Sequence, residues 1–424
     1  MAEIFPPPKY VQTESMVDGI TIFKPAPVEE KQVAQVSFKC PQCGANTAYS
    51  VADGGLECTY CGYYEAPTAE KVGKSAEQFE FKVETLERLA QGWGEERREL
   101  SCQSCGASVS IPAKSISVTC PFCGSNNVIQ KQASQSDLRP KFLIPMKIEM
   151  ETCRRIAKEW LGSSWMTPAE LKSSALLRDF TPIYLPYWTF DSTCSADWKA
   201  EVGHEVTERY YDHGEWKTRT KIEWRWESGH VQMNFDDMLV EATARLSKKH
   251  LGAINKFDIR ELTEYDPKYL AGMHAKSYDI PLENSWETAR ERMREATKQA
   301  CIHQASTSHV RNLTMSLDFS DESWRYVLLP VYISVYHYQN QSFQILINGQ
   351  NGQISGQRPA DWQKVWLVII LCLLPGAFLG LIGLVTLLFG GVGAFIGGFG
   401  FFLLVIGLII AFTIFQKAQS LDDL

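Results

Sequence analysis

Eight of the twelve cysteines form four Cys-x2-Cys pairs, and this spacing is the clearest chemical signal in the chain. The pairs combine into two sets with one pattern, Cys-x2-Cys-x14-Cys-x2-Cys, and the second set lies 62 residues after the first. The predicted metal ligands are Cys40, Cys43, Cys58 and Cys61, followed by Cys102, Cys105, Cys120 and Cys123. Zn²⁺ in structural sites takes four such thiolates in a tetrahedron. We therefore expect two structural zinc ions per chain, with no open ligand position for catalysis.

A glycine follows each of these cysteine pairs, namely Gly44, Gly62, Gly106 and Gly124. Glycine adopts positive φ freely, so the backbone can turn there and direct amide N–H groups at the sulfur atoms. The pattern predicts two small β zinc ribbons, at residues 36–66 and 100–131. A segment of about 30 residues buries too little core to fold alone, and metal binding, worth on the order of 10–16 kcal/mol, supplies the missing stability.

The other four cysteines, Cys153, Cys194, Cys301 and Cys372, have no partner at motif spacing. The first thirty residues contain no apolar run of signal length. We therefore expect a reducing compartment, in which paired cysteines bind metal rather than form disulfides. The four isolated cysteines are interpreted as small buried apolar side chains.

The charge distribution bears on what the ribbons bind. The chain has a net charge of −7, and residues 36–66 contain Lys39 as their one basic residue. Surfaces that bind nucleic acid without sequence preference usually carry basic stripes. A protein partner is thus favoured for the ribbons, and two alternatives stay open: a purely structural cap and a nucleic-acid-binding surface.

Near the C-terminus, no Asp, Glu, Lys or Arg occurs from residue 365 to residue 415. The segments 365–389 and 392–415 are each long enough, at ~1.5 Å per residue, to cross a hydrocarbon core of ~30 Å. The short join at Gly390-Gly391 predicts a transmembrane helical hairpin, and small residues (Gly376, Gly380, Gly393 and Gly397) are expected where its helices meet.

Lys364 and Lys417 flank this hairpin and would lie on one side of the bilayer. The positive-inside rule and the need for reduced cysteines both place that side in the cytoplasm. We expect a two-pass protein of the inner (cytoplasmic) membrane, with its soluble domains, both termini and the tail 416–424 cytoplasmic.

Between the ribbons and the hairpin, residues 138–358 are predicted to form an α+β domain. Strands are expected at 142–148, 183–190, 326–338 and 343–347, and a hairpin of strands 202–211 and 215–226. Helices are expected around Cys153–Trp160, after Thr167-Pro168, and from a cap at Ser285 to Gln304. Residues 1–35 are expected to be a mobile tail, and 67–99 a connector whose helix starts at Ser75 and Gln78 and runs to Trp93.

Part of this domain looks duplicated. Ile144-Pro145-Met146, a helix and Leu185-Pro186-Tyr187-Trp188 are echoed by Ile280-Pro281-Leu282, a helix and Leu329-Pro330-Val331-Tyr332. Only the loop lengths differ. A true duplication would imply two related α/β halves that share one core, and chance similarity stays as the alternative.

Other candidate motifs lack essential parts. Gly73-Lys74-Ser75 resembles the end of a phosphate-binding loop, but that loop's first glycine would stand at Thr68. The acid pairs Asp236-Asp237 and Asp321-Glu322 are interpreted as solvated turns or helix caps. An aromatic set is interpreted as cross-strand packing, with a ligand groove as the alternative; its members are Tyr184, Tyr187, Trp188, Trp198, Trp224, Trp226, Tyr332, Tyr336 and Tyr338.

Together with the tandem ribbons, three further motifs carry a resemblance: Ile183–Asp191, Tyr265–Gly272 and Ile347–Gly352. The chain resembles bacterial membrane-anchored tandem zinc-ribbon proteins, often labelled as similar to primosomal protein N′ or as having a transcription-factor-B-type zinc ribbon. The first label would imply a helicase, but the sequence has neither a Walker A loop nor a DEAD-type box.

The sequence contains no complete catalytic set, so we expect a non-enzymatic adaptor or assembly factor that holds a protein partner at the membrane. Two alternatives stay open. One is a membrane-tethered nucleic-acid-binding protein, and the other is a ligand-binding or enzymatic α+β domain with structural ribbons.

Overall fold

The structure is a computed structural model of the chain. It describes residues 10–13, 22–25, 38–76, 78–80, 93, 97–112, 119–132, 138–172, 180–339, 341–387 and 392–422. Within these residues the fold is α+β, as predicted: two four-cysteine clusters on small strands, a large mixed sheet and a C-terminal pair of apolar helices.

Two very long strands form the centre of the molecule. Strand β11 (Thr181–Asp212) pairs antiparallel with β15 (Val310–Tyr338) on one side and with β12 (Glu215–Glu241) on the other. Residues 183–190 of β11 are buried on both faces, which explains their nearly continuous apolar sequence. The predicted hairpin around residues 212–214 is confirmed, but the strands expected at 183–190 and 202–211 are one continuous strand.

Shorter strands widen this sheet to the order β13-β10-β15-β11-β14-β8-β7-β9. Their bounds are β7 Arg97–Cys102, β8 Ser108–Pro112, β9 Val128–Gln132, β10 Phe142–Leu143, β13 Thr263–Glu264 and β14 His274–Ala275; β16 (Gln341–Asn348), β17 (Ile354–Gly356) and β6 (Phe79–Glu80) add to the β15 side. Strand β10 is therefore much shorter than the 142–148 expected, because the chain turns at Pro145 toward a helix.

Two helices cover one face of the sheet, and each packs against the strand hairpin that does not follow it in the chain. Helix α2 (Met150–Gly162) precedes β11 but packs against Tyr332 and Ile345 of the β15–β16 hairpin. Helix α4 (Leu282–Gln304) precedes β15 but packs against Trp188 and Val240 of the β11–β12 hairpin. The short helix α3 (Lys248–Ala253) follows β12.

The strand register supports the predicted duplication. Leu185 pairs in register with its equivalent Leu329, Pro186 pairs with Leu328, and Pro330 pairs with Tyr184. The pairing is therefore symmetric about the Leu185–Leu329 pair, as a twofold axis through that pair requires. The exchange of α2 and α4 follows from the same axis.

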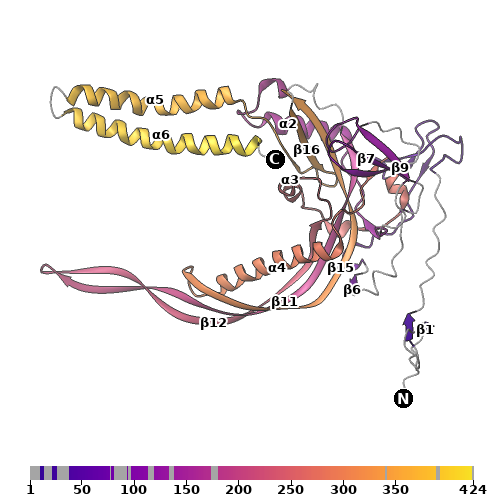
Figure 1. The fold of residues 1–424 in the computed structure, drawn as a ribbon, viewed down its shortest axis with the longest axis horizontal. Coiled ribbons are helices and arrows are strands. Elements are labelled where there is room, and N and C mark those ends of the chain that lie inside the picture. Colours follow the sequence, from indigo (N-terminus) through magenta and orange to yellow (C-terminus); the bar gives the residue numbers. More distant parts are fainter. Residues whose placement is uncertain are drawn as a thin grey trace, which may run out of the picture.

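Beyond the body, strands β11, β12 and β15 continue as a projecting arm, with α4 lying along it (Figure 1). Strand β15 begins at Val310, which pairs with Val202, so the arm has three strands only on the body side of this pair. Farther out, residues 204–223 are two-stranded. We call the end of this hairpin, residues 204–226, the distal ribbon. At about 3.3 Å per residue, β11 extends about 66 Å from residue 192 to its tip.

The C-terminal helices α5 (Trp362–Leu387) and α6 (Val392–Asp422) form an antiparallel pair that projects from the body in the same direction as the arm (Figure 1). Both are long and apolar enough to span a bilayer, and most of each span is exposed within the chain. The join at Gly390-Gly391 lies outside the described residues. The expected tail 416–424 is helical as far as Asp422, because Ala418 and Leu421 pack on the body-proximal end of the pair.

Several expected elements differ. The connector does not begin a helix at Ser75: Gly73–Ser75 is a 3-10 turn and Phe79–Glu80 is strand β6, while the rest of the expected helix lies outside the described residues. Helix α4 starts at Leu282, after Pro281, so Ser285 is a buried helical residue and not a cap.

Two further expectations concern short segments. A helix was expected to begin after Pro168. The structure has a 3-10 turn at Ala169–Lys172, and residues 173–179 lie outside the described residues. In the expected tail 1–35, β1 (Tyr10–Thr13) pairs with β2 (Ile22–Pro25), and the rest lies outside the described residues.

Glycines allow the close approach of α5 and α6: Gly376 and Gly383 in α5, and Gly400 and Gly407 in α6, each pair seven residues apart. A Cβ on Gly383 would lie 2.3 Å from the nitrogen of Gly397, and a Cβ on Gly400 would lie 2.4 Å from the nitrogen of Gly380. The expected glycines all lie at the contact: a Cβ on Gly376 would lie 2.5 Å from the nitrogen of Leu404, and Gly380, Gly393 and Gly397 supply atoms that approach Gly400 or Gly383. The sequence interpretation missed Gly383 and Gly400, which make the closest approaches.

We predict that Gly383→Ala or Gly400→Ala forces the helices apart at a cost of about 1–3 kcal/mol, because backbone atoms cannot yield to the added methyl group. Hydrogen exchange of α5 and α6 in detergent micelles should become faster. Gly398→Ala is the matched control, since nothing lies within 4 Å of its Cβ. Equal exchange in all three variants would contradict this account of the crossing.

Candidate metal centres

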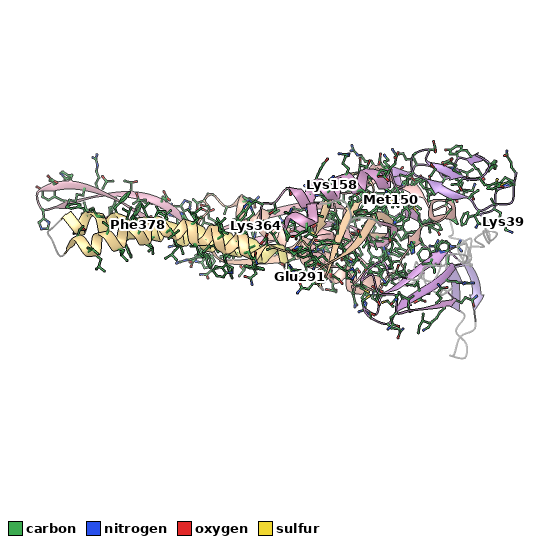
Figure 2. The ribbon with its side chains drawn as sticks, turned by 90° about the horizontal axis from the view of Figure 1, so that it is seen from above. Lys39, Met150, Lys158, Glu291, Lys364 and Phe378 are labelled. Atoms are coloured by element: carbon green, nitrogen blue, oxygen red, sulfur yellow. The ribbon has the colours of Figure 1, made fainter. Side chains whose placement is uncertain are left out.

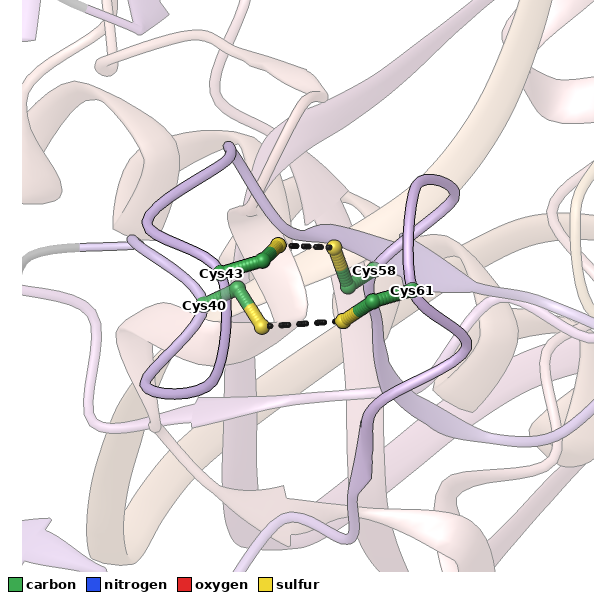
Figure 3. Close-up of side chains that lie close together, drawn as sticks. All are labelled: Cys40, Cys43, Cys58 and Cys61. Carbon is green, nitrogen blue, oxygen red and sulfur yellow. Dashed lines mark hydrogen bonds between the residues drawn. The ribbon is translucent and has the colours of Figure 1, made fainter.

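The first cysteine cluster joins two loops of the first ribbon. Cys40 and Cys43 lie on a turn before β3 (Ala48–Ser50), and Cys58 and Cys61 on a turn between β4 (Gly55–Glu57) and β5 (Tyr64–Glu65). Figure 3 shows the four side chains turned toward one another. The facing sulfur pairs are 3.4 Å (Cys40–Cys61) and 3.6 Å (Cys43–Cys58) apart.

The second cluster repeats this geometry. Cys102 and Cys105 lie at the turn after β7, and Cys120 and Cys123 at the turn before β9. The Cys102–Cys123 and Cys105–Cys120 sulfur distances are 3.6 and 3.7 Å. The four cysteines of each predicted set thus lie together, with their sulfur atoms within 4.8 Å of one another.

The sulfur distances fit a shared metal ion. A disulfide requires about 2.05 Å between sulfurs. Four thiolates around Zn²⁺ at about 2.3 Å stand roughly 3.8 Å apart in a tetrahedron. The observed 3.4–3.7 Å are close to the second value. Each cluster could therefore hold one metal ion.

All four turns share one backbone structure. The amide after each pair donates to the carbonyl of the pair's first cysteine, as in Gly44 N to Cys40 O at 2.9 Å and Gly106 N to Cys102 O at 3.0 Å. The four glycines have φ between 69° and 74°. The predicted reason for glycine at these positions is confirmed, because a side chain at this φ would be strained.

The thiols differ in their readiness to ionise. Backbone hydrogen bonds from Cys61 and Tyr60 lower the pKa of Cys58 to about 7. Burial raises the pKa of Cys123 to about 11, and it raises the pKa of Cys120 further. Four thiolates this close repel one another, so the fully ionised set needs a bound cation.

The two ribbons are attached to the body in different ways. The first ribbon has its own three-stranded sheet and is held by the amide of Tyr49, which donates to Ala271 O, and by an ion pair between Lys268 and Glu65 at 2.6 Å. The second ribbon belongs to the large sheet. Its residues Leu100 and Ile111 are fully buried in the main core.

A cluster of charges that the sequence interpretation missed lies at the base of the arm. Arg325 is 0% exposed, its Nη1 donates to Asp237 Oδ1, and its Nη2 lies 3.8 Å from Asp191 Oδ2. Asp236, the third acid, pairs with Lys74. Burial raises the pKa of both Asp191 and Asp237, and the neighbouring Arg325 opposes this rise.

The interpretation of the two acid pairs as turns or caps is wrong. Both lie inside long strands where the register shifts, and Asp237 and Asp321 adopt positive φ of 57° and 53°. Aspartate tolerates this conformation better than most residues. The signal in the sequence was two adjacent acids interrupting an alternating strand pattern. With Arg325 and Lys74 already opposing the three acids, we interpret the cluster as structural.

Other sequence candidates are accounted for by packing. Within the aromatic set, Tyr184, Tyr187, Trp188, Trp198, Tyr332 and Tyr336 are buried in the sheet, as the cross-strand interpretation predicted. Trp224 and Trp226 instead are exposed on the arm. Of the isolated cysteines, Cys153, Cys194 and Cys301 are buried and Cys372 is half-buried in α5.

We predict that Cys40→Ser and Cys102→Ser each release one metal ion per chain, and that the double variant releases both, because three thiolates hold the ion less tightly than four. Elemental analysis of the purified chain measures this directly. Cys153→Ser, which changes a buried cysteine outside both clusters, should retain the full content. Unchanged metal in Cys40→Ser would contradict the assignment.

For the charge cluster, we predict that Arg325→Leu lowers the free energy of unfolding by about 3–5 kcal/mol, because it leaves buried carboxylates without a counter-charge. Chemical denaturation measures the loss. Arg219→Ala, which removes an exposed ion pair with Glu208, should cost at most about 1 kcal/mol. Similar losses in both variants would show that the buried cluster is not structural.

Comparison with known proteins shows a distant relationship. Over 362 residues, which are 84% of this chain and 99% of the other protein, the chain is 25% identical to YdjG of Bacillus subtilis (strain 168), described as an uncharacterized protein. No protein-family model matches the chain, and no solved structure matches it. The similarity thus extends over nearly the whole of a bacterial protein whose description names no activity.

Proposed function

We propose that this chain is a membrane-anchored adaptor of the tandem zinc-ribbon group, which holds a protein partner at the cytoplasmic face of the inner membrane. The anchor is the α5–α6 pair, and the two cysteine clusters hold structural Zn²⁺. One observation carries the proposal: the apolar helix pair and the first metal ribbon lie at opposite ends of the molecule. Figure 2 shows Phe378 of α5 at one end and Lys39 of the ribbon at the other.

The exposed surface of the helices supports the anchor. Leu367, Leu371, Phe378 and Leu381 are all more than half exposed. A contiguous apolar surface of this size is a liability in water and a requirement in a bilayer. The flanking Lys364 and Lys417, and thiols that must stay reduced, support the cytoplasmic placement of the remaining chain.

The exposed knuckle of the first ribbon supports docking there. Tyr60 precedes Cys61 and is 83% exposed, and no hydrogen bond, ion pair or ring contact is recorded for its side chain among the described residues. Tyrosine is enriched among the residues that dominate protein interfaces. The metal would fix the turn that presents Tyr60, so zinc in this proposal acts on shape and not on chemistry.

The alternative partner, nucleic acid, is favoured by one feature. Arg97, Arg98 and Lys131 line a basic hollow at the edge of the second ribbon. The guanidinium of Arg97 already donates hydrogen bonds to Ser110 and to Met273 O, which leaves it few donors for a phosphate. Binding that falls steeply with salt would mark this alternative.

We predict that Tyr60→Ala removes a specific protein partner while leaving the metal bound, because Tyr60 is not a ligand. Crosslinking in intact cells, detergent extraction and mass spectrometry would compare this variant with the wild type. The loss of a principal interface side chain should weaken binding by more than 1 kcal/mol, or roughly fivefold.

The matched control is Trp165→Ala, because Trp165 is also an exposed aromatic but belongs to neither ribbon: it lies in the turn between α2 and Ala169–Lys172, next to Met166, which packs against α5. It should retain every partner. Partners unchanged in Tyr60→Ala and in the Cys40→Ser/Cys102→Ser double variant would contradict docking through the ribbons. Loss of nucleic acid in place of protein would favour the alternative.

A further inference from the structure

An exposed apolar stripe runs along one face of the distal ribbon. Trp216 is 72% exposed, Tyr211 62% and Trp226 56%, with Ile222 and Trp224 between them also exposed. The four residues from β12 lie an even number of positions apart along the strand, so their side chains share one face. Tyr211 of β11 stands directly opposite Trp216 and points to the same face. From Trp216 to Trp226 the stripe is about 33 Å long.

The opposite face of the distal ribbon is polar and already paired. Arg219 donates to Glu208 at 3.1 Å, and Glu223 accepts from Lys221 and Arg225 at 3.2 Å. The ribbon is therefore amphipathic. Most of its charged side chains lie on one face, whereas the stripe face carries the five apolar side chains together with Arg209 and Glu205, which stand opposite Thr218 and Ile222. Nearer the body, α4 packs on the polar side of the arm and not on the stripe.

Such a ribbon needs a surface to cover it. Two-stranded sheets without a packed face are marginally stable in water. Among the described residues, β15 pairs with β11 only as far as Val202, which stands opposite Arg225, and α4 ends at Gln304, so neither extends over residues 204–223. The apolar face would have to bury itself against something outside the body.

The direction of the arm identifies that surface. The arm and the α5–α6 pair project to the same side of the body in Figures 1 and 2. If the pair crosses a bilayer in this orientation, the arm would enter the bilayer too. The distal ribbon carries five basic and five acidic residues, and a charged residue costs about 2.5–3.5 kcal/mol at the bilayer centre even on the most permissive scale.

The arm must therefore turn out of the bilayer when the helices insert. The link between body and helices allows this, because it rests on a small apolar contact at Val365 and Ile369 and on backbone bonds such as Asp361 N to Met166 O. The nearest place for an amphipathic ribbon is the bilayer surface, where Trp and Tyr rings are enriched.

We propose that the distal ribbon lies on the bilayer surface, with its aromatic stripe in the headgroup region and its charged face toward the cytoplasm. This inference rests on the membrane anchor of the proposed function. Lys199 stacks on Trp226, 5.1 Å from the ring centre, and places a cation beside the stripe. Arg311, 4.0 Å from the ring centre of Trp224, is already paired with Glu201 at 2.5 Å. A lipid phosphate would pair with Lys199, so anionic lipid is the preferred surface.

The test places the photo-crosslinking residue p-benzoylphenylalanine at Trp216 or at Trp224 in the full chain, reconstituted in vesicles of phosphatidylcholine with phosphatidylglycerol. Tyr210 is the matched control, because it is an exposed aromatic near the same tip but on the polar face. After illumination, mass spectrometry should find lipid adducts at both stripe positions, and moving the crosslinker to Tyr210 should abolish them.

A fourth position, Phe378 in α5, separates the two proposals. Lipid adducts at Phe378 without adducts at Trp216 and Trp224 would overturn the surface contact and leave the anchor intact. Adducts from the stripe to a second copy of the chain or to another protein would also overturn it. The absence of lipid adducts at all positions, Phe378 included, would overturn the anchor and this inference together.

Discussion

Between residues 181 and 202, β11 is hydrogen-bonded to β15 with two register shifts, and the rest of the body is placed relative to that pairing. Its apolar half carries the main core on one face and the α2 and α4 contacts on the other. Its polar half continues outward as the arm. Where the halves meet, the register shifts and the buried Arg325 joins carboxylates of two neighbouring strands. The β11–β15 pair thus forms both the centre of the body and the base of the projecting arm.

The metal clusters relate to this frame in two ways. The second ribbon donates Leu100 and Ile111 to the main core, so its metal would stabilise the body itself. The first ribbon is attached through few contacts, among them the Lys268–Glu65 pair, so its metal would maintain a separate module. A fold that places one such module at the opposite end from an apolar helix pair suits a protein that presents a docking site away from its membrane anchor. We see the arm as the third contact of that arrangement.

Local chemistry was readable from the sequence, and long-range geometry was not. The two cysteine clusters and the positive φ of their glycines were predicted because the spacing repeats one local pattern, in which each set of four thiols could hold a metal ion. The continuity of β11 was missed because Asp191-Ser192-Thr193 looks like a break, whereas a bulge carries the strand past it. Ser285 looked like a cap because its chemistry suits one, but core packing of Leu282 and Trp286 extends the helix to Pro281. The pairing of Asp237 with Arg325, 88 residues away, leaves no local pattern at all.

The most direct test of the account is protease protection in oriented membranes. Protease added to intact spheroplasts should leave the chain whole, whereas protease added to inverted inner-membrane vesicles should digest everything except a fragment containing residues 365–415. That result would place the metal ribbons, the body and the arm on one side, the cytoplasmic one, with the helix pair in the bilayer. Cleavage in spheroplasts, or release of the intact chain from the membrane by an alkaline wash, would contradict it.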